Sequence, residues 1–214
     1  MWSTLLDLLV PRRCAVCARF STLASPDLCA TCAATWEATE VEPTSDGTPR
    51  FTVALHEGAA RDAVIALKFR GEQWRGRPLG RMLASASRGV LPAYDVVVPV
   101  PLGRRRLRKR GYNQAAEVAF GFASATGDRV DVRSVRRFRE TTPQSTLSAE
   151  ERRAIRGAFA ASVRPGTRVL LVDDVSTTGE TLAACTLAVE ACGAWVAAGL
   201  SVTYAPRPEH AADG

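Results

Sequence analysis

The stretch VLLVDDVSTTGET, from Val169 to Thr181, constrains the fold more than any other part of this chain. Its four apolar residues are typical of a buried strand in a parallel sheet. In a continuing strand the next two side chains, Asp173 and Asp174, would point to opposite faces. We therefore expect the strand to end at this pair, Val175 to Gly179 to form a turn, and a helix to begin near Thr181.

Two adjacent carboxylates followed by a helix start indicate a particular kind of ligand. Carboxylates about 4 Å apart repel by roughly 4 kcal/mol at an effective dielectric constant of 20, so they need hydroxyl donors, a metal or a basic neighbour. The first N–H groups of a helix lack internal partners and favour a phosphate. A ribose phosphate would satisfy both features. The alternative is an acid-ended strand like the Walker B half of an NTPase, but the sequence contains neither a P-loop motif nor a Rossmann glycine fingerprint.

Apolar strand-like runs alternate with helical patterns from Phe51 onwards, which predicts an α/β domain with a mostly parallel sheet over residues 49–214. A capping box at Ser148 and Glu151 predicts a further short helix, and the polar segment before it is a candidate mobile loop. The expected strands are FTVAL, DVVVPV, VDVRSVRRF, RVLLV and WVAAGLSVTY, and the longer helices are ARDAVIALKF, 78–87, 113–125 and 181–192.

Four of the six cysteines have the spacing of metal ligands, C-x2-C-x11-C-x2-C. In a cytoplasmic chain this spacing favours one tetrahedral zinc ion, with an iron–sulfur cluster or a redox pair as alternatives. A polar stretch with two prolines and a glycine follows Trp36 and is typical of a linker. We therefore expect residues 1–48 to form a small zinc-binding module and linker. The four ligands would be Cys14, Cys17, Cys29 and Cys32.

Positive charge is concentrated in one place. The net charge is +6, and the window Arg104 to Arg110 alone carries six positive charges, so the rest of the chain sums to zero. We expect a basic loop that meets nucleic acid or a small polyanion, or that is merely solvated. No apolar run approaches the roughly 18 residues needed to cross a bilayer. The amino terminus lacks the pattern of a signal peptide, so we expect a cytoplasmic protein.

Taken together, these motifs resemble a known family. VLLVDDVSTTGET is similar to the phosphoribosyl-pyrophosphate signature of type I phosphoribosyltransferases. The order of CxxC…CxxC, LKFRGE, VPVPL…RGYNQ, TPQSTLSAEERR…GAF and this signature resembles that of ComF-type proteins such as ComFC and GntX, over nearly the whole chain. Such proteins join an amino-terminal zinc module to a phosphoribosyltransferase-type domain, and some are tied to DNA uptake in natural competence.

The resemblance implies roles for individual residues. Asp173 and Asp174 would be the catalytic pair that holds the ribose hydroxyls, and magnesium would bridge the pyrophosphate oxygens. The family usually has an asparagine where this chain reads Arg152 to Arg156, which leaves the role of that position open. The residues expected around the 5′-phosphate are Val175, Ser176, Thr177, Thr178, Gly179 and Thr181. Those expected on the pyrophosphate side or in the mobile loop, each of which could instead be surface charge or a turn residue, are Lys68, Arg70, Arg110, Tyr112, Asn113, Gln144 and Arg153.

Two functions are compatible with this reading. The first is a magnesium-dependent transferase that moves phosphoribose from phosphoribosyl pyrophosphate to an unknown acceptor. The second is a non-catalytic module that binds a ribose phosphate or single-stranded DNA and supports DNA uptake. Only Tyr112 lies close to the basic window in sequence, which argues against a base-stacking platform. The zinc module could also serve only to staple the amino terminus to the larger domain, under either function.

Overall fold

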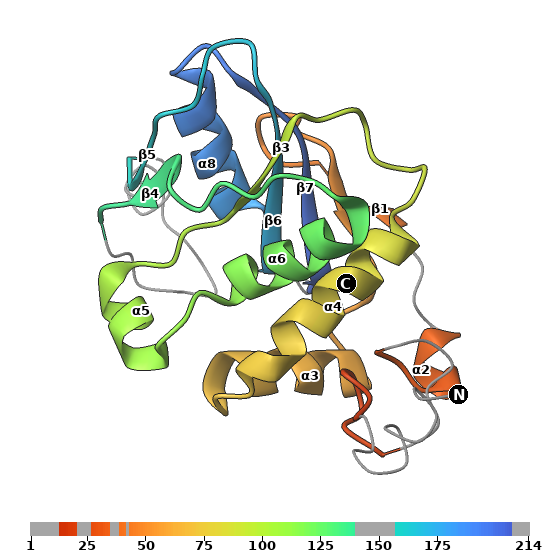
Figure 1. Cartoon of the computed structure of the whole chain (residues 1–214). Helices are drawn as coiled ribbons and strands as arrows, with labels where there is room; N and C mark the ends of the chain where they lie inside the picture. Colours follow the sequence, from red (N-terminus) through yellow and green to blue (C-terminus); the bar gives the residue numbers. More distant parts are fainter. Residues whose placement is uncertain (1–12, 21–26, 35–38, 42, 140–156, 207–214) are drawn as a thin grey trace, which may run out of the picture.

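The structure, a computed structural model, describes residues 13–20, 27–34, 39–41, 43–139 and 157–206 (Figure 1). Its main sheet has the strand order β1-β2-β7-β6-β3, in which every neighbouring pair is parallel except β1 with β2. This confirms the predicted α/β fold with a mostly parallel sheet. The strands are β1 (Thr39–Val41), β2 (Arg50–Thr52), β3 (Val96–Pro99), β6 (Arg168–Ser176) and β7 (Trp195–Tyr204).

Helices cover both faces of this sheet (Figure 1). Leu170 and Val172 pack into the core formed with α3 (Gly58–Phe69), α4 (Gly76–Ala86) and α6 (Gln114–Thr126). Leu171 packs on the opposite side, against α8 (Glu180–Glu190). Because β6 is buried on both faces, its sequence is a continuous apolar run rather than an alternating one. Among the described residues, no helix is both long and apolar enough to span a bilayer.

One predicted strand is broken in two, so the expectation for VDVRSVRRF is wrong in its middle. Val130 makes only an isolated bridge to Val97. The Asp131 carboxylate then accepts hydrogen bonds from the backbone N–H groups of Arg133 and Ser134, at 2.8 and 3.0 Å, which turns the chain. The remainder forms β4 (Val135–Arg137), which pairs antiparallel with β5 (Phe159–Ala161) in a separate two-stranded sheet.

The basic window is a helix, α5 (Arg104–Arg110), rather than the predicted loop. Arginine, leucine and lysine all have good helix propensity, and glycines stand on both sides of the window. Gly111 ends the helix in the left-handed conformation, with φ +81°. The positive charges of the last turn, including Arg110, also complement the negative end of the helix dipole.

Glycines allow α4 and α6 to approach very closely. A Cβ atom placed on Gly80 would lie 2.0 Å from the carbonyl oxygen of Val118, and one on Gly121 would lie 2.0 Å from that of Arg77. Both contacts are with backbone atoms, which cannot rotate away. Leu83 of α4 and Val118 of α6 belong to the same buried core, so this close contact fixes how the two helices pack on the sheet.

We expect Gly80→Ala to destabilise the fold by about 2 kcal/mol, because overpacking against backbone costs about 3 kcal/mol and the better helix propensity of alanine offsets about 1. Urea unfolding followed by circular dichroism measures the change. Ser85→Ala on the exposed side of the same helix is the control and should stay within about 0.5 kcal/mol of the unaltered protein. Equal stabilities of the two variants would contradict the close helix contact.

Candidate functional site

Strand β6 continues through the aspartate pair, so the predicted end of the strand before Asp173 is wrong. Asp173 pairs with Ser201 of β7, and the ladder extends to Ser176. The two carboxylates therefore leave opposite faces of the strand. Asp174 meets Lys68 of α3. On the other face lies Cys185 of α8, whose pKa is raised by burial and further by the neighbouring Asp173. Hydrogen bonding to β7 extends the strand beyond its apolar run, and no local signal in the sequence predicts this.

An ion pair joins Asp174 to the last turn of α3. Lys68 Nζ lies 3.0 Å from Asp174 Oδ1, and the two side chains are 23% and 7% exposed. Arg110, at the end of α5, also lies in the field of Asp174; burial lowers the pKa of Arg110 and the Asp174 charge opposes this. Residues from α3, α5 and β6 thus bring two cations and a carboxylate to the carboxyl edge of the sheet, where ligands bind in open α/β folds.

The two aspartates differ in their electrostatics. Burial, reinforced by the neighbouring Asp174 charge, raises the pKa of Asp173 well above its usual range. Lys68 opposes this shift. The Asp173 carboxylate also accepts a hydrogen bond from the backbone N–H of Asp174, at 2.8 Å. The environment therefore favours a neutral Asp173 beside an Asp174 that is paired with a cation.

The last residue of β6 and the three residues that follow it form a turn, Ser176–Gly179, which we call the phosphate turn. Gly179 has φ +77° and is the cap of α8, whose first internal bond runs from Ala183 N–H to the Gly179 carbonyl at 2.8 Å. Thr178 Oγ1 accepts from the backbone N–H of Glu180 at 3.4 Å, and the Thr177 side chain is exposed. The prediction differs at both ends of the turn, because Val175 and Ser176 still belong to β6 and α8 begins at Glu180, one residue before the predicted start. The turn and the first N–H groups of α8, which have no acceptor within the helix itself, can receive an anion.

The other predicted site residues divide into three groups. Tyr112 donates its hydroxyl to the Leu67 carbonyl, which ties the start of α6 to α3 beside Lys68. Asn113 caps α6 by accepting from Ala115 N–H at 3.2 Å and donates to the Val100 carbonyl at 3.0 Å, so both ends of its amide are used within the fold. Arg70 is exposed at the end of α3. Gln144, Arg153 and the Ser148–Glu151 capping box lie outside the described residues.

Two residues near this edge were missed from the sequence. Arg50 of β2 is 2% exposed and donates from Nη1 to Ser176 Oγ at 2.9 Å and to the Thr177 carbonyl at 3.0 Å. His56 Nδ1 lies 2.8 Å from Thr203 Oγ1 at the end of β7. Burial lowers the pKa of His56, helped by the charges of Lys68 and Arg61 and opposed by Asp174. Neither residue belongs to a motif, and only the fold brings them to the site.

The four predicted metal ligands form one cluster. The sulfur atoms of Cys14, Cys17, Cys29 and Cys32 all lie within 4.8 Å of one another and could bind a single metal ion such as zinc. Burial raises the pKa of Cys14, but hydrogen bonds from the backbone of Cys29, Cys17 and Val16 outweigh it and lower this pKa to about 7. Such backbone donors stabilise a thiolate, which is the form that binds metal. Four cysteine sulfur atoms this close together form a donor set that fits zinc.

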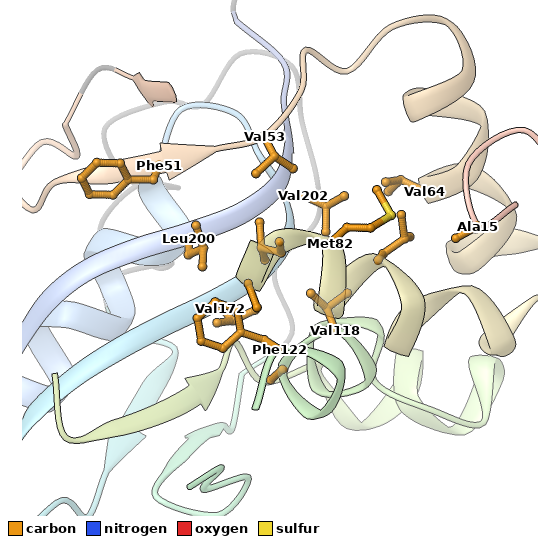
Figure 2. Packing of buried hydrophobic residues seen from close by; sticks show 14 of the residues in the cluster. Ala15, Phe51, Val53, Val64, Met82, Val118, Phe122, Val172, Leu200 and Val202 are labelled. Atoms are coloured by element: carbon orange, nitrogen blue, oxygen red, sulfur yellow. The ribbon is translucent and has the colours of Figure 1, made fainter. Parts of the chain in front are cut away.

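The cysteine cluster packs against the helices that form the site. Ala15 belongs to the same buried core as Val64 of α3 and Met82 of α4, and Figure 2 shows these side chains close together. Arg75, 5% exposed, donates from Nη1 to the carbonyls of Ala15 and Val16 at 2.6 and 3.0 Å. Arg81 makes an ion pair with the buried Asp27. The cluster and the helices form one continuous packed body.

The parallel sheet, the acidic strand end and the turn that opens α8 together define the type I phosphoribosyltransferase fold. Residues 93–209, more than half of the chain, match the phosphoribosyl transferase domain, and the chain belongs to that family. The match contains β3, α5, α6, β6, α8 and β7, whereas Arg50, His56 and Lys68 lie before it.

Two curated relatives confirm the resemblance to ComF-type proteins. Competence protein F of Haemophilus influenzae is 38% identical over 126 residues, which cover 54% of this chain and 55% of that protein. DNA utilization protein YhgH of Salmonella typhi is 35% identical over 147 residues, 65% of this chain and 60% of that protein. The chain thus spans less than two thirds of the length of these relatives. Among solved structures, adenine phosphoribosyltransferase from Thermoanaerobacter pseudethanolicus is 21% identical, with a TM-score of 0.40, over 67% of this chain and 73% of that one.

Proposed function

We propose that this protein binds phosphoribosyl pyrophosphate with magnesium and transfers phosphoribose to an acceptor. One observation carries the proposal: the Lys68–Asp174 ion pair lies at the carboxyl end of β6, directly before the phosphate turn and the start of α8. Along the chain, a carboxylate that can accept hydrogen bonds from ribose hydroxyls is therefore followed directly by an anion-binding turn. They suit the two ends of one ribose phosphate.

In this proposal the cations act on the leaving group. Breaking the bond to pyrophosphate builds negative charge on the pyrophosphate and positive charge on the sugar. Lys68 and Arg110 converge on Asp174 from two helices, so they would stabilise the leaving group while the carboxylate faces the sugar. Magnesium binds through one or two carboxylates and substrate phosphates, and Asp174 offers such an oxygen on the side of the strand that meets Lys68. When bound, the ion neutralises charge on the pyrophosphate.

Titration calorimetry tests this assignment directly. Phosphoribosyl pyrophosphate titrated with magnesium should show saturable binding to the full chain, and ribose 5-phosphate and pyrophosphate should each compete with it. Incubation with the donor and a mixture of nitrogenous bases, followed by mass spectrometry, then distinguishes a transferase from a binding module. Absence of donor binding would reject both forms of the proposal.

Zinc in the cysteine cluster forms a second part of the proposal. The cytoplasm keeps thiols reduced and available to metal, so we place the protein there. Residues 1–48 would form a metal-stabilised module that packs on residues 49–214. The polar stretch after the cysteines connects this module to the sheet, because it supplies β1 and because Thr44 and Thr48 within it are buried. Elemental analysis of purified protein should find close to one zinc ion per chain.

A second candidate function is single-stranded DNA binding in DNA uptake. The two relatives are named as a competence protein and a DNA utilization protein. A contact not expected from the sequence favours it: the Arg110 guanidinium lies 4.9 Å from the centre of the Phe69 ring, which is 70% exposed. The fold thus adds an exposed aromatic ring to the basic helix α5. Aromatic rings beside a row of cations can stack bases while the cations contact phosphates.

If α5 and Phe69 bind single-stranded DNA, a salt titration should distinguish the contribution of the charges to the affinity from that of base stacking. Arg108→Ala combined with Lys109→Ala should make the log-log salt slope about 1.4 less steep, because each phosphate contact contributes about 0.7. Phe69→Ala should weaken binding about tenfold at every salt concentration without changing the slope. Fluorescence anisotropy with a labelled oligonucleotide measures both effects. Affinity that is independent of salt would exclude this candidate.

A further inference from the structure

The buried arginine of β2 contacts the inner side of the phosphate turn. Arg50 and the turn are separated by 126 residues in sequence, yet Nη1 donates both to Ser176 Oγ at 2.9 Å and to the Thr177 carbonyl at 3.0 Å. The guanidinium carbon also lies 5.5 Å from the centre of the Tyr204 ring, at the end of β7. One guanidinium thus joins two consecutive residues of the turn to the end of a neighbouring strand.

The glycine of the turn lies directly against this side chain. A Cβ atom on Gly179 would lie 3.1 Å from Arg50 Nη1, 3.2 Å from its Cζ and 3.0 Å from Thr44 Cγ2. Gly179 also has φ +77°, a conformation that side chains disfavour. The inner side of the turn is therefore filled, and the turn can receive a ligand only on its outer side, where the Thr177 side chain is exposed.

The hydrogen bond to the Thr177 carbonyl has a consequence for the next residue. A trans peptide is planar, so its carbonyl oxygen and the following N–H point in opposite directions. Because Arg50 holds the Thr177 carbonyl inward, the N–H of Thr178 is directed outward. The negative end of this peptide dipole is kept away from the anion-binding side, and a positive end is presented there together with the first N–H groups of α8.

We propose that Arg50 is a positioning residue that holds the phosphate turn in its anion-binding conformation and so sets the affinity for the 5′-phosphate of the donor without contacting it. The inference rests on the proposed binding of a ribose phosphate at this turn. Arginine suits the task because its planar fork donates along fixed directions, whereas lysine supplies the charge without that geometry. Arg50→Lys therefore separates charge from positioning.

The test is titration calorimetry of the full chain with two probes, ribose 5-phosphate and inorganic pyrophosphate. For Arg50→Lys we expect ribose 5-phosphate to bind about tenfold more weakly, the loss of one charged hydrogen bond. Pyrophosphate, which would occupy the Lys68 and Arg110 side, should bind within about twofold of the unaltered protein. Tyr204→Leu removes the ring beneath the guanidinium but keeps both hydrogen bonds. It should weaken ribose 5-phosphate binding about threefold and remains informative if Arg50→Lys does not fold.

Arg75→Lys is the matched control, since Arg75 is also buried and also makes two hydrogen bonds from Nη1, in its case to two backbone carbonyls of the cysteine module. It should lower thermal stability but leave ribose 5-phosphate binding within about twofold of the unaltered protein. Unchanged ribose 5-phosphate binding in Arg50→Lys, or an equal loss for both probes, would overturn the positioning role while leaving the proposed function intact. Failure of the unaltered protein to bind ribose 5-phosphate would overturn both.

Discussion

Replacing Asp174 by asparagine is expected to weaken phosphoribosyl pyrophosphate binding about a hundredfold, because hydrogen bonds from ribose hydroxyls to a charged acceptor contribute roughly 1.5–3 kcal/mol each. The change also removes the partner of Lys68, whose ammonium lies 3.0 Å from the carboxylate. The Lys68 side chain is 23% exposed, so water can hydrate its charge and the fold should persist. Calorimetry with the donor and magnesium measures the loss, and circular dichroism checks the fold.

Two other aspartates provide sharp controls. Asp173→Asn should weaken binding by less than about threefold, because the raised pKa of Asp173 already favours the neutral acid that asparagine resembles. Asp95→Asn should leave the affinity unchanged, since Asp95 pairs with Arg168 at the opposite edge of the sheet. Equal losses in the Asp173 and Asp174 variants would contradict the asymmetry between the two carboxylates, and no loss in either would contradict the site.

The parts of the fold that follow from sequence are those with strong local periodicity. The run that becomes β6 is buried on both faces, and the helices α3, α4, α6 and α8 begin and end within about two residues of their predicted bounds. The cysteine spacing likewise predicted a cluster that the structure confirms. In each case the residues that carry the signal are neighbours in sequence, so a single stretch contains the information.

The remaining features depend on contacts between distant residues. Arg50 reaches Ser176 across 126 positions, and nothing near Arg50 in the sequence distinguishes it from a surface arginine. The Phe69 ring meets Arg110 only because α3 and α5 converge at one edge of the sheet. The continuation of β6 past Asp173 similarly depends on pairing with β7. Tertiary contacts, rather than local propensity, determine these details of the site.

The cysteine module packs against the helix that carries Lys68, which would give a bound metal a role beyond folding its own segment. Cys14 and Cys32 belong to the same buried core as Leu67, the residue before Lys68, and Leu67 also accepts the Tyr112 hydroxyl. Arg75 is the last residue of η1 (Gln73–Arg75), the short helix that follows α3, and it donates to the carbonyls of Ala15 and Val16 in the cysteine module. Loss of order in the module would therefore expose one side of α3 and loosen the Lys68–Asp174 pair.

Cys14→Ser is accordingly expected to remove the metal and to lower the melting temperature by about 10 °C, since binding free energy at a structural zinc site is folding free energy and about 3–5 kcal/mol should be lost. Donor affinity should fall about tenfold as α3 loses its support. Elemental analysis, differential scanning calorimetry and donor titration measure the three effects. Hydrogen exchange should show the loss of protection in α3 and leave α8, on the opposite face of the sheet, unchanged.

Cys192→Ser is the matched control, because this thiol lies outside the cluster and donates to the Ala161 carbonyl at 3.2 Å. It should keep the metal, the donor affinity and the protection of α3. A Cys14→Ser protein that melts earlier but binds the donor with full affinity would show that the module only staples the amino terminus to the larger body. Weakened binding with α3 exposed would instead establish that the metal maintains one side of the donor site through the helix that carries Lys68.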